Sequence, residues 1–296
     1  MRLLPNRSSA GRVSRLWRSR RDGPSLWPAV LLSWFLVVEL APAAQAETVT
    51  IAAAADLTYC IEDLNRSYQQ SHPGTELKLS AGSSGNFSSQ IQNGAPFDVF
   101  LSADIQYPKN LASSGFVDPS TLTVYAVGRI VLWTTKPESV NLDRGIEVLR
   151  DRSAVKKIAI ANPEHAPYGR AAKAVLENSG IWAEVQDRIV QGENIAQTTQ
   201  FVQTGNVDAG FVALSLLLSP NLRHIGRYIE IDPKLYPKLE QAMVLTKGGA
   251  NRPVVRDYFQ FLQSQAARTI FDQYGFTLPT NDDERQRTSA NDNERH

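Results

Sequence analysis

Small hydroxyl residues and glycines are concentrated in residues 81–91, whose sequence is AGSSGNFSSQI. This stretch stands where a strand-like segment, residues 75–80, changes into a helix-like one. The N-terminus of a helix presents backbone N–H groups that have no partner within the helix, and these attract anions. Glycines allow a ligand close to the backbone, and serines add hydroxyl donors. Because the stretch carries no charge, it predicts a site that captures a small anion through neutral donors and can release it.

The same stretch could be an ordinary connecting loop, because serine and glycine are common in turns. Its place in the chain favours a functional interpretation. Residues 49–55 and 98–102 are typical of buried strands, and Asp56 directly precedes an apolar helical period. The resulting order is strand, helix, strand, helix, strand, and ligands of such sheets gather at the carboxyl ends of the strands. Both Asp56 and Ser84 fall at such ends.

A second unit of the same kind follows. Strand-like residues 156–161 end in the turn NPEHAPYG, which opens a helix, and another helix is expected to begin near Ile195. We therefore predict an α/β protein of two lobes, each a mostly parallel sheet flanked by helices, joined by crossing strands and enclosing a cleft. The predicted domains are a signal peptide (1–46), lobe I (47–126 and 242–279), lobe II (127–241) and a disordered polar tail (280–296).

Composition argues against several classes of function. Of 31 basic and 30 acidic side chains, the first 46 residues contain seven arginines and two acids, so the remaining 24 basic and 28 acidic side chains give a net charge near −4. No basic stripe for nucleic acid is left. The single cysteine, Cys60, excludes an internal disulfide and a thiolate metal cluster, and the four histidines have no metal-ligand spacing. Since no phosphate-loop or dinucleotide motif is present either, we expect no cofactor.

Residues 1–46 have the layout of an export signal. A basic segment precedes an apolar run at 28–40, and small residues occupy the −3 and −1 positions of a cut after Ala46. The run is shorter than the roughly 20 residues of a transmembrane helix, although an uncleaved anchor is the alternative. Arg20-Arg21 only weakly suggests a twin-arginine signal, so the export route stays open. The mature chain is predicted to begin near Glu47.

Five segments occur in the order seen in periplasmic molybdate-binding proteins of ABC transporters, and the chain resembles that family from about residue 49 to residue 278. The segments are AAADL (53–57), SS (83–84), GAPFDVFLSAD (94–104), NPEHAPYG (162–169) and YGF (274–276). The third and fourth together are specific, whereas the serine pair alone is not. The resemblance implies a type II periplasmic binding fold: a hinged, two-lobed trap in the periplasm that closes on a tetrahedral oxyanion and is not an enzyme.

The resemblance also implies which positions contact the anion. In the first lobe they are Asp56 and Ser84, and in the second they are Tyr168 and the backbone N–H of Ile195. The sequence departs from the family pattern twice, because a hydroxyl residue is usual at Asp56 and some members have a tyrosine where Ala213 stands. Tyr168 is then the residue that can supply the missing phenol. No metal is implied beyond the one inside the oxyanion.

Asp56 is the charged residue in a site that should be neutral. Two like charges about 4 Å apart repel by on the order of 4 kcal/mol at an effective dielectric constant of 20. In the preferred interpretation the side chain folds back to cap its own helix, while nearby backbone N–H groups face the anion. In the alternative, Asp56 accepts a proton from a protonated oxyanion such as hydrogen phosphate, which would change the ligand.

The leading hypothesis is a monomeric solute-binding protein that captures molybdate, and also tungstate because the two anions share charge and nearly share size, for a membrane permease of an ABC transporter. A receptor for another oxyanion, phosphate or sulfate, is the first alternative. An exported hydrolase that uses Ser84 or His165 is the second, although no nucleophile-elbow motif occurs. The third is an interaction or sensory domain that kept the fold without transport.

Overall fold

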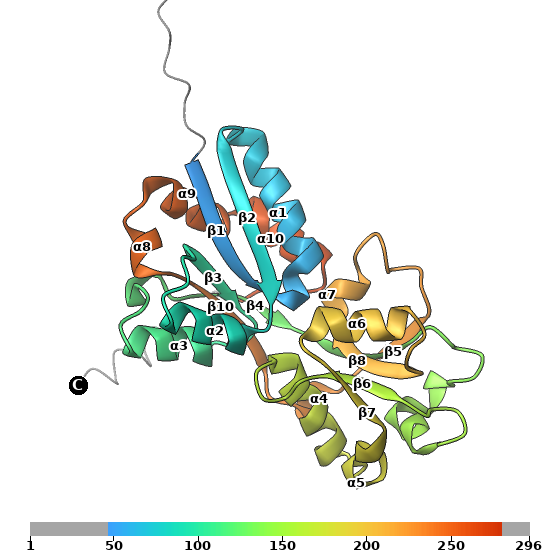
Figure 1. Cartoon of the computed structure of the whole chain (residues 1–296). Helices are drawn as coiled ribbons and strands as arrows, with labels where there is room; N and C mark the ends of the chain where they lie inside the picture. The colour runs from blue at the N-terminus through green and yellow to red at the C-terminus, as the bar shows by residue number, and fades with distance from the viewer. Residues whose placement is uncertain (1–46, 280–296) are drawn as a thin grey trace, which may run out of the picture. The chain divides into compact units, whose positions relative to one another are not determined.

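The computed structural model describes residues 47–279, so the predicted signal peptide and polar tail lie outside the described residues. The strands of this part form two five-stranded sheets (Figure 1). In spatial order, the first sheet consists of β2 (Thr75–Gly82), β1 (Glu47–Ala54), β3 (Val99–Ser102), β10 (Leu239–Leu245) and β4 (Thr123–Gly128). The second consists of β7 (Ile189–Gly192), β6 (Ile158–Ala161), β8 (Ala209–Ala213), β5 (Ile130–Thr134) and β9 (Arg227–Glu230). Each sheet with its helices is called a lobe below.

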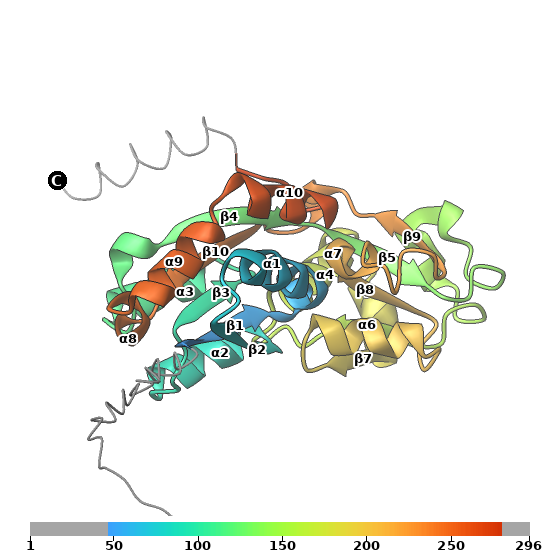
Figure 2. The same ribbon diagram turned by 90° about the horizontal axis from the view of Figure 1, so that it is seen from above.

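Helices cover both faces of the first sheet. On one face, Ile51 and Leu101 belong to a core shared with α1, α9 and α10, and on the other, Ala52 and Phe100 pack with α2 and α3. Figure 2 shows α9 and α10 on one side of the sheet and α2 on the other. The bounds of the helices in this lobe are α1 (Thr58–Ser71), α2 (Ser84–Gln92), α3 (Gln106–Ser113), α8 (Lys247–Ala250), α9 (Pro253–Phe261) and α10 (Gln265–Gln273).

The second sheet is covered in the same way. Ile158 and Phe211 pack with α4, and Trp133 and Val212 pack on the opposite face with α6 and α7. A strand buried on both faces must be apolar throughout, which explains the uninterrupted apolar runs of β5, β6 and β8. The helices of this lobe are α4 (Pro167–Asn178), α5 (Trp182–Val185), α6 (Ile195–Gln203) and α7 (Leu214–Leu217).

The prediction of a two-lobed α/β protein is confirmed, but the sheets are mixed and not mostly parallel as expected. β1 runs parallel to β2 and β3, and β6 runs parallel to β7 and β8, whereas the pairings of β10 and β5 with their neighbours are antiparallel. The antiparallel strands are those next to the passage between lobes: β4 and β5 are separated only by Arg129, and the chain returns through residues 231–238. The exact domain boundaries stay a prediction.

Two local features differ from the sequence expectation. β9 has the sequence RYIE and lies largely exposed at the sheet edge, so no apolar period announces it. The apolar pattern of residues 254–276 predicts one helical segment, whereas the structure has the two helices α9 and α10 there, because Ser264 caps α10 with its side chain. Over residues 47–279, no helix is both long and apolar enough to cross a membrane.

Candidate anion-binding site

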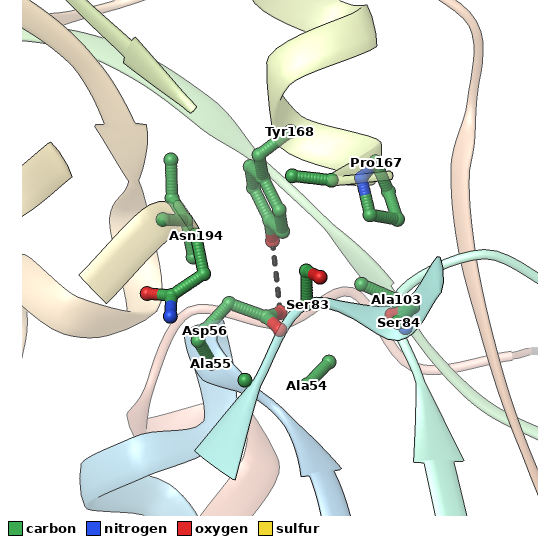
Figure 3. A pocket seen from close by; sticks show the side chains of 12 residues that line it. Ala54, Ala55, Asp56, Ser83, Ser84, Ala103, Pro167, Tyr168 and Asn194 are labelled. Atoms are coloured by element: carbon green, nitrogen blue, oxygen red, sulfur yellow. Dashed lines mark hydrogen bonds between the residues drawn. The ribbon is translucent and has the colours of Figure 1, made fainter. Parts of the chain in front are cut away.

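A small pocket lies where the two lobes meet. Ends of β1 and β2 form its floor, and the first turns of helices from both lobes form its walls (Figure 3). Its volume is about 10 Å³, close to the least that holds one water molecule. Hydrogen bonds from the Gly85 N–H to the His165 backbone oxygen and from the Tyr168 hydroxyl to Asp56 Oδ2 join the lobes at this place, so the lobes are closed. The lining residues are Ala54, Ala55, Asp56, Gly82, Ser83, Ser84, Ala103, Ala166, Pro167, Tyr168, Asn194 and Ile195.

Three helices begin at this pocket, α2 from the first lobe and α4 and α6 from the second. Ser83 caps α2 by accepting a hydrogen bond from the Asn86 N–H, and Asn194 caps α6 by accepting from the N–H groups of Ala196 and Gln197. None of the three helices carries an acidic residue in its first turn. In α2 the Gly85 N–H donates to the backbone oxygen of His165, so the N–H groups left for the pocket are those of Ser84 in α2 and Ile195 in α6. The positive ends of the helix dipoles add to their attraction for an anion.

The Ser84 hydroxyl is fixed by one hydrogen bond. Its Oγ accepts from the backbone N–H of Ala103, just beyond β3, at 3.0 Å, and the residue is fully buried. A hydroxyl group can accept and donate at the same time. Ser84 therefore keeps its O–H proton for an acceptor in the pocket. The serine stretch is not a separate loop in front of a helix but the first turn of α2 itself, which begins at Ser84.

Asp56 is held by residues from both lobes. Its Oδ2 accepts hydrogen bonds from the Tyr168 hydroxyl at 3.1 Å and from Gln241 Nε2 at 2.5 Å, and Gln241 Nε2 also lies 3.3 Å from the Tyr168 hydroxyl. Figure 3 shows the Tyr168 ring pointing from α4 toward the carboxyl group. All three side chains are buried, and Asp56 Oδ1 has no hydrogen-bond partner.

Burial controls the protonation of this group. It raises the pKa of Asp56 to about 6, although the hydrogen bonds from Gln241 and Tyr168 act in the opposite direction. Burial, and then the charge of Asp56, raise the pKa of Tyr168 well above its usual range. Tyr168 therefore stays a neutral donor, whereas Asp56 can change its charge close to neutral pH.

The expectation that Asp56 caps its own helix is wrong. α1 begins at Thr58, its N-cap is Leu57, and no side chain caps it. Residues 55–57 form a turn of 3-10 helix in which the Asp56 side chain is directed at the pocket, where two neutral donors satisfy Oδ2. Tyr168 follows Asp56 by 112 residues and Gln241 follows it by 185 residues, so no local sequence pattern predicts that they contact Asp56.

The four residues implied as anion contacts, Asp56, Ser84, Tyr168 and Ile195, all line this pocket. Their contact with an anion stays a prediction. No sequence pattern points to Gln241, whereas Asn194 could have been found as a capping residue in front of the helix at Ile195. Gln241 lies within β10, between Glu240 and the apolar run of residues 242–245.

The arrangement does not resemble a hydrolase site. Ser84 Oγ contacts the Ala103 N–H, whereas Nε2 of His165 lies 3.3 Å from Glu193 Oε1. The backbone oxygen of His165, not its ring, reaches the serine turn, where it accepts from the Gly85 N–H at 3.0 Å. Residues 47–279 contain no group of three or more His, Cys, Asp or Glu side chains that could hold a metal ion. What the pocket offers is a set of neutral donors and one buried carboxyl group.

Comparisons with known proteins identify the family. The model of the family "Bacterial extracellular solute-binding protein" matches residues 49–277. The chain is 40% identical over 240 residues to the molybdate-binding protein ModA of Azotobacter vinelandii, covering 81% of this chain and 93% of that protein. It is 35% identical over 241 residues to ModA of Rhodobacter capsulatus, covering 81% and 92%. The solved structure of the Azotobacter vinelandii periplasmic molybdate-binding protein superposes with a TM-score of 0.73 at 31% identity, covering 78% of this chain and all of that one. The chain therefore belongs to the family of bacterial extracellular solute-binding proteins, in the group that includes the molybdate-binding proteins.

Proposed function

We propose that this protein captures molybdate, and also tungstate, in the interlobe pocket and delivers it to the membrane permease of an ABC transporter. The observation that carries the proposal is the convergence of three helix N-termini and the Ser84 hydroxyl on one pocket between two lobes. Such donors suit a tetrahedral oxyanion. The names of the relatives at 40% and 35% identity support molybdate as the ligand.

In this proposal the protein binds and releases the anion as a monomer, without a chemical reaction, a cofactor or a nucleic acid partner. Both lobes supply donors, so the anion is bound fully only when they close, as in hinged binding proteins. The backbone hydrogen bond from Gly85 to His165 and the ion pair between Arg170 and Asp104, at 2.5 Å, join the lobes beside the pocket. These contacts would stabilise the closed form that a permease recognises. Export by residues 1–46 would place the protein in the periplasm.

A receptor for phosphate is the alternative that a specific observation favours. Asp56 Oδ1 is a buried acceptor without a partner, and hydrogen phosphate, unlike molybdate at neutral pH, carries a proton to donate.

A thermal-shift series tests the proposal with molybdate, tungstate, sulfate and phosphate in turn. A ligand at 100 times its Kd adds about 2.7 kcal/mol to the stability of the folded state. We expect molybdate and tungstate to raise the Tm and sulfate and phosphate to leave it unchanged. Ser84→Ala, which removes one donor, should reduce the shift. A Tm that responds to phosphate alone would favour the alternative, and a Tm that responds to no anion would contradict both.

A further inference from the structure

The buried carboxyl group of Asp56 has one satisfied and one unsatisfied oxygen. Oδ2 takes both available hydrogen bonds, from Tyr168 and Gln241, and Oδ1 has none. Asp56 is 1% exposed and lines the pocket. Buried polar atoms nearly always have a partner, and an exception calls for an explanation. A group that enters the pocket and shares a proton with Oδ1 would supply the missing partner.

Among residues 47–279, no positively charged side chain contributes to the pKa of Asp56. Cys60 of α1, Tyr125 of β4 and Tyr168 of α4 are the titratable groups that face it, and burial raises the pKa of each, so all three stay neutral. Gln241 of β10 and Ser215 of α7, whose hydroxyl donates to the Asp56 backbone oxygen at 2.7 Å, are uncharged as well. An ionised Asp56 and a bound dianion would therefore repel each other across a small buried space.

We propose that Asp56 takes up one proton from solvent when the oxyanion binds, and that the proton lies between Oδ1 and an oxygen of the anion. This inference rests on the proposed function and assigns Asp56 as the residue that links anion capture to pH. The proton balance is simple: a carboxylate, a dianion and one proton from water give a neutral carboxyl group hydrogen-bonded to the dianion. The only bond that forms is the O–H bond of the carboxyl group, and the solvent molecule that gives the proton loses its own O–H bond.

The charge of Asp56 before the anion binds is consistent with proton uptake on binding. Even in the closed form, where burial raises the pKa of Asp56 to about 6, the group is mostly ionised at pH 7.5 as long as no anion is bound. The negative charge of the anion raises that pKa further, since a nearby like charge disfavours ionisation. Binding then includes the uptake of about one proton, and the Kd for the dianion rises about tenfold between pH 7 and pH 8. Acidic surroundings favour capture, and alkaline ones favour release.

Isothermal titration calorimetry with sodium molybdate as the probe measures the proton directly. The heat of binding at pH 7.5, compared between buffers of different ionisation enthalpy, gives the number of protons taken up. We expect about one for the unaltered protein and none for Asp56→Asn, whose Kd should be the same at pH 7 and pH 8. Glu62→Gln, which changes an exposed carboxyl group on α1, is the matched control and should keep the uptake.

The outcomes separate this inference from the proposed function. If the unaltered protein binds molybdate with no proton uptake, or Asp56→Asn keeps the uptake, the inference is overturned and the function stands. If the unaltered protein binds no molybdate, the proposed function fails as well. A third result would also overturn the inference: the unaltered protein binds phosphate without taking up a proton, and Asp56→Asn abolishes that binding. The proton between Asp56 and the anion would then arrive with the hydrogen phosphate and not from solvent. The measurement on the unaltered protein decides the matter even if Asp56→Asn does not fold.

Discussion

The buried position of Asp56 lowers the stability of the folded protein by an amount that depends on pH. A rise of its pKa from the ordinary 3.8 to about 6 means that the folded state holds the proton more tightly than the unfolded state. The free energy of unfolding should therefore fall as the pH rises from about 4 to about 6, and stay low above that, by about 3 kcal/mol in total. Asp56→Asn lacks this titration and keeps an oxygen that can accept from Tyr168 and Gln241.

Urea denaturation at pH 4, 5, 6 and 7 tests this. The stability of Asp56→Asn minus that of the unaltered protein should grow by about 3 kcal/mol across the series. Taking the difference removes the contributions of carboxyl groups that both proteins share, such as Asp208, whose pKa is lowered. If the difference in stability between the two proteins stayed constant with pH, burial would not raise the pKa of Asp56.

Single residues of the site were predictable to the extent that they stand at element ends. Asp56 and Ser84 were found from strand ends, and Tyr168 and Ile195 came from the family resemblance, and the structure brings all four to one pocket. The second partner of Asp56, Gln241, was not predictable. Gln241 lies in the middle of β10, and its role depends on a strand that crosses back from the second lobe after 185 residues.

At the scale of elements, the first turns of helices supply the donors of the proposed anion site. Asn194 shows how the start of such a helix is fixed. Its side chain accepts two hydrogen bonds, both at 3.0 Å, that fix the start of α6 next to the Ile195 N–H. Asn194→Ala should cost about 1 kcal/mol of stability by removing the cap. Asn194→Asp keeps the cap and should restore that stability, yet it adds a negative charge to the pocket lining.

Asn194→Asp should therefore bind the oxyanion at least about tenfold more weakly than the unaltered protein, since repulsion on the order of several kcal/mol exceeds the 1.4 kcal/mol of a tenfold change. Calorimetry and urea denaturation on the two variants separate the effects. If Asn194→Asp bound molybdate as tightly as the unaltered protein, the start of α6 would not be close to the anion.

Element positions were largely readable from the sequence because buried strands and amphipathic helices have distinct apolar periods. The strands β1, β3 and β6 were expected within a few residues of their observed bounds. The prediction of element bounds failed where something other than the burial of apolar side chains sets the position of a strand or a helix end. The edge strand β9 pairs with β5 through its backbone while its side chains stay exposed, and the break between α9 and α10 depends on one capping serine.

At the scale of the whole molecule, closure of the lobes depends on a close approach at Gly85. This glycine lies in the first turn of α2, and its N–H donates to the His165 backbone oxygen across the cleft. A Cβ atom at this position would lie 2.8 Å from the Cβ and O atoms of His165 and from the Tyr107 hydroxyl. Two of these contacts involve the opposite lobe, so a methyl group here would hold the lobes apart.

Gly85→Ala should consequently weaken anion binding without weakening the fold. Alanine favours the helix over glycine by up to about 1 kcal/mol, so the unliganded protein should be as stable as before or slightly more so. The Kd for molybdate should rise, because the donors of the second lobe no longer reach the anion, and small-angle scattering should show less compaction when the ligand is added. Gly74→Ala is the control, since a Cβ there has no neighbour within 4 Å. Unchanged affinity and full compaction in Gly85→Ala would mean that the anion is held without the lobe contact at Gly85, and that closure is not what completes the site.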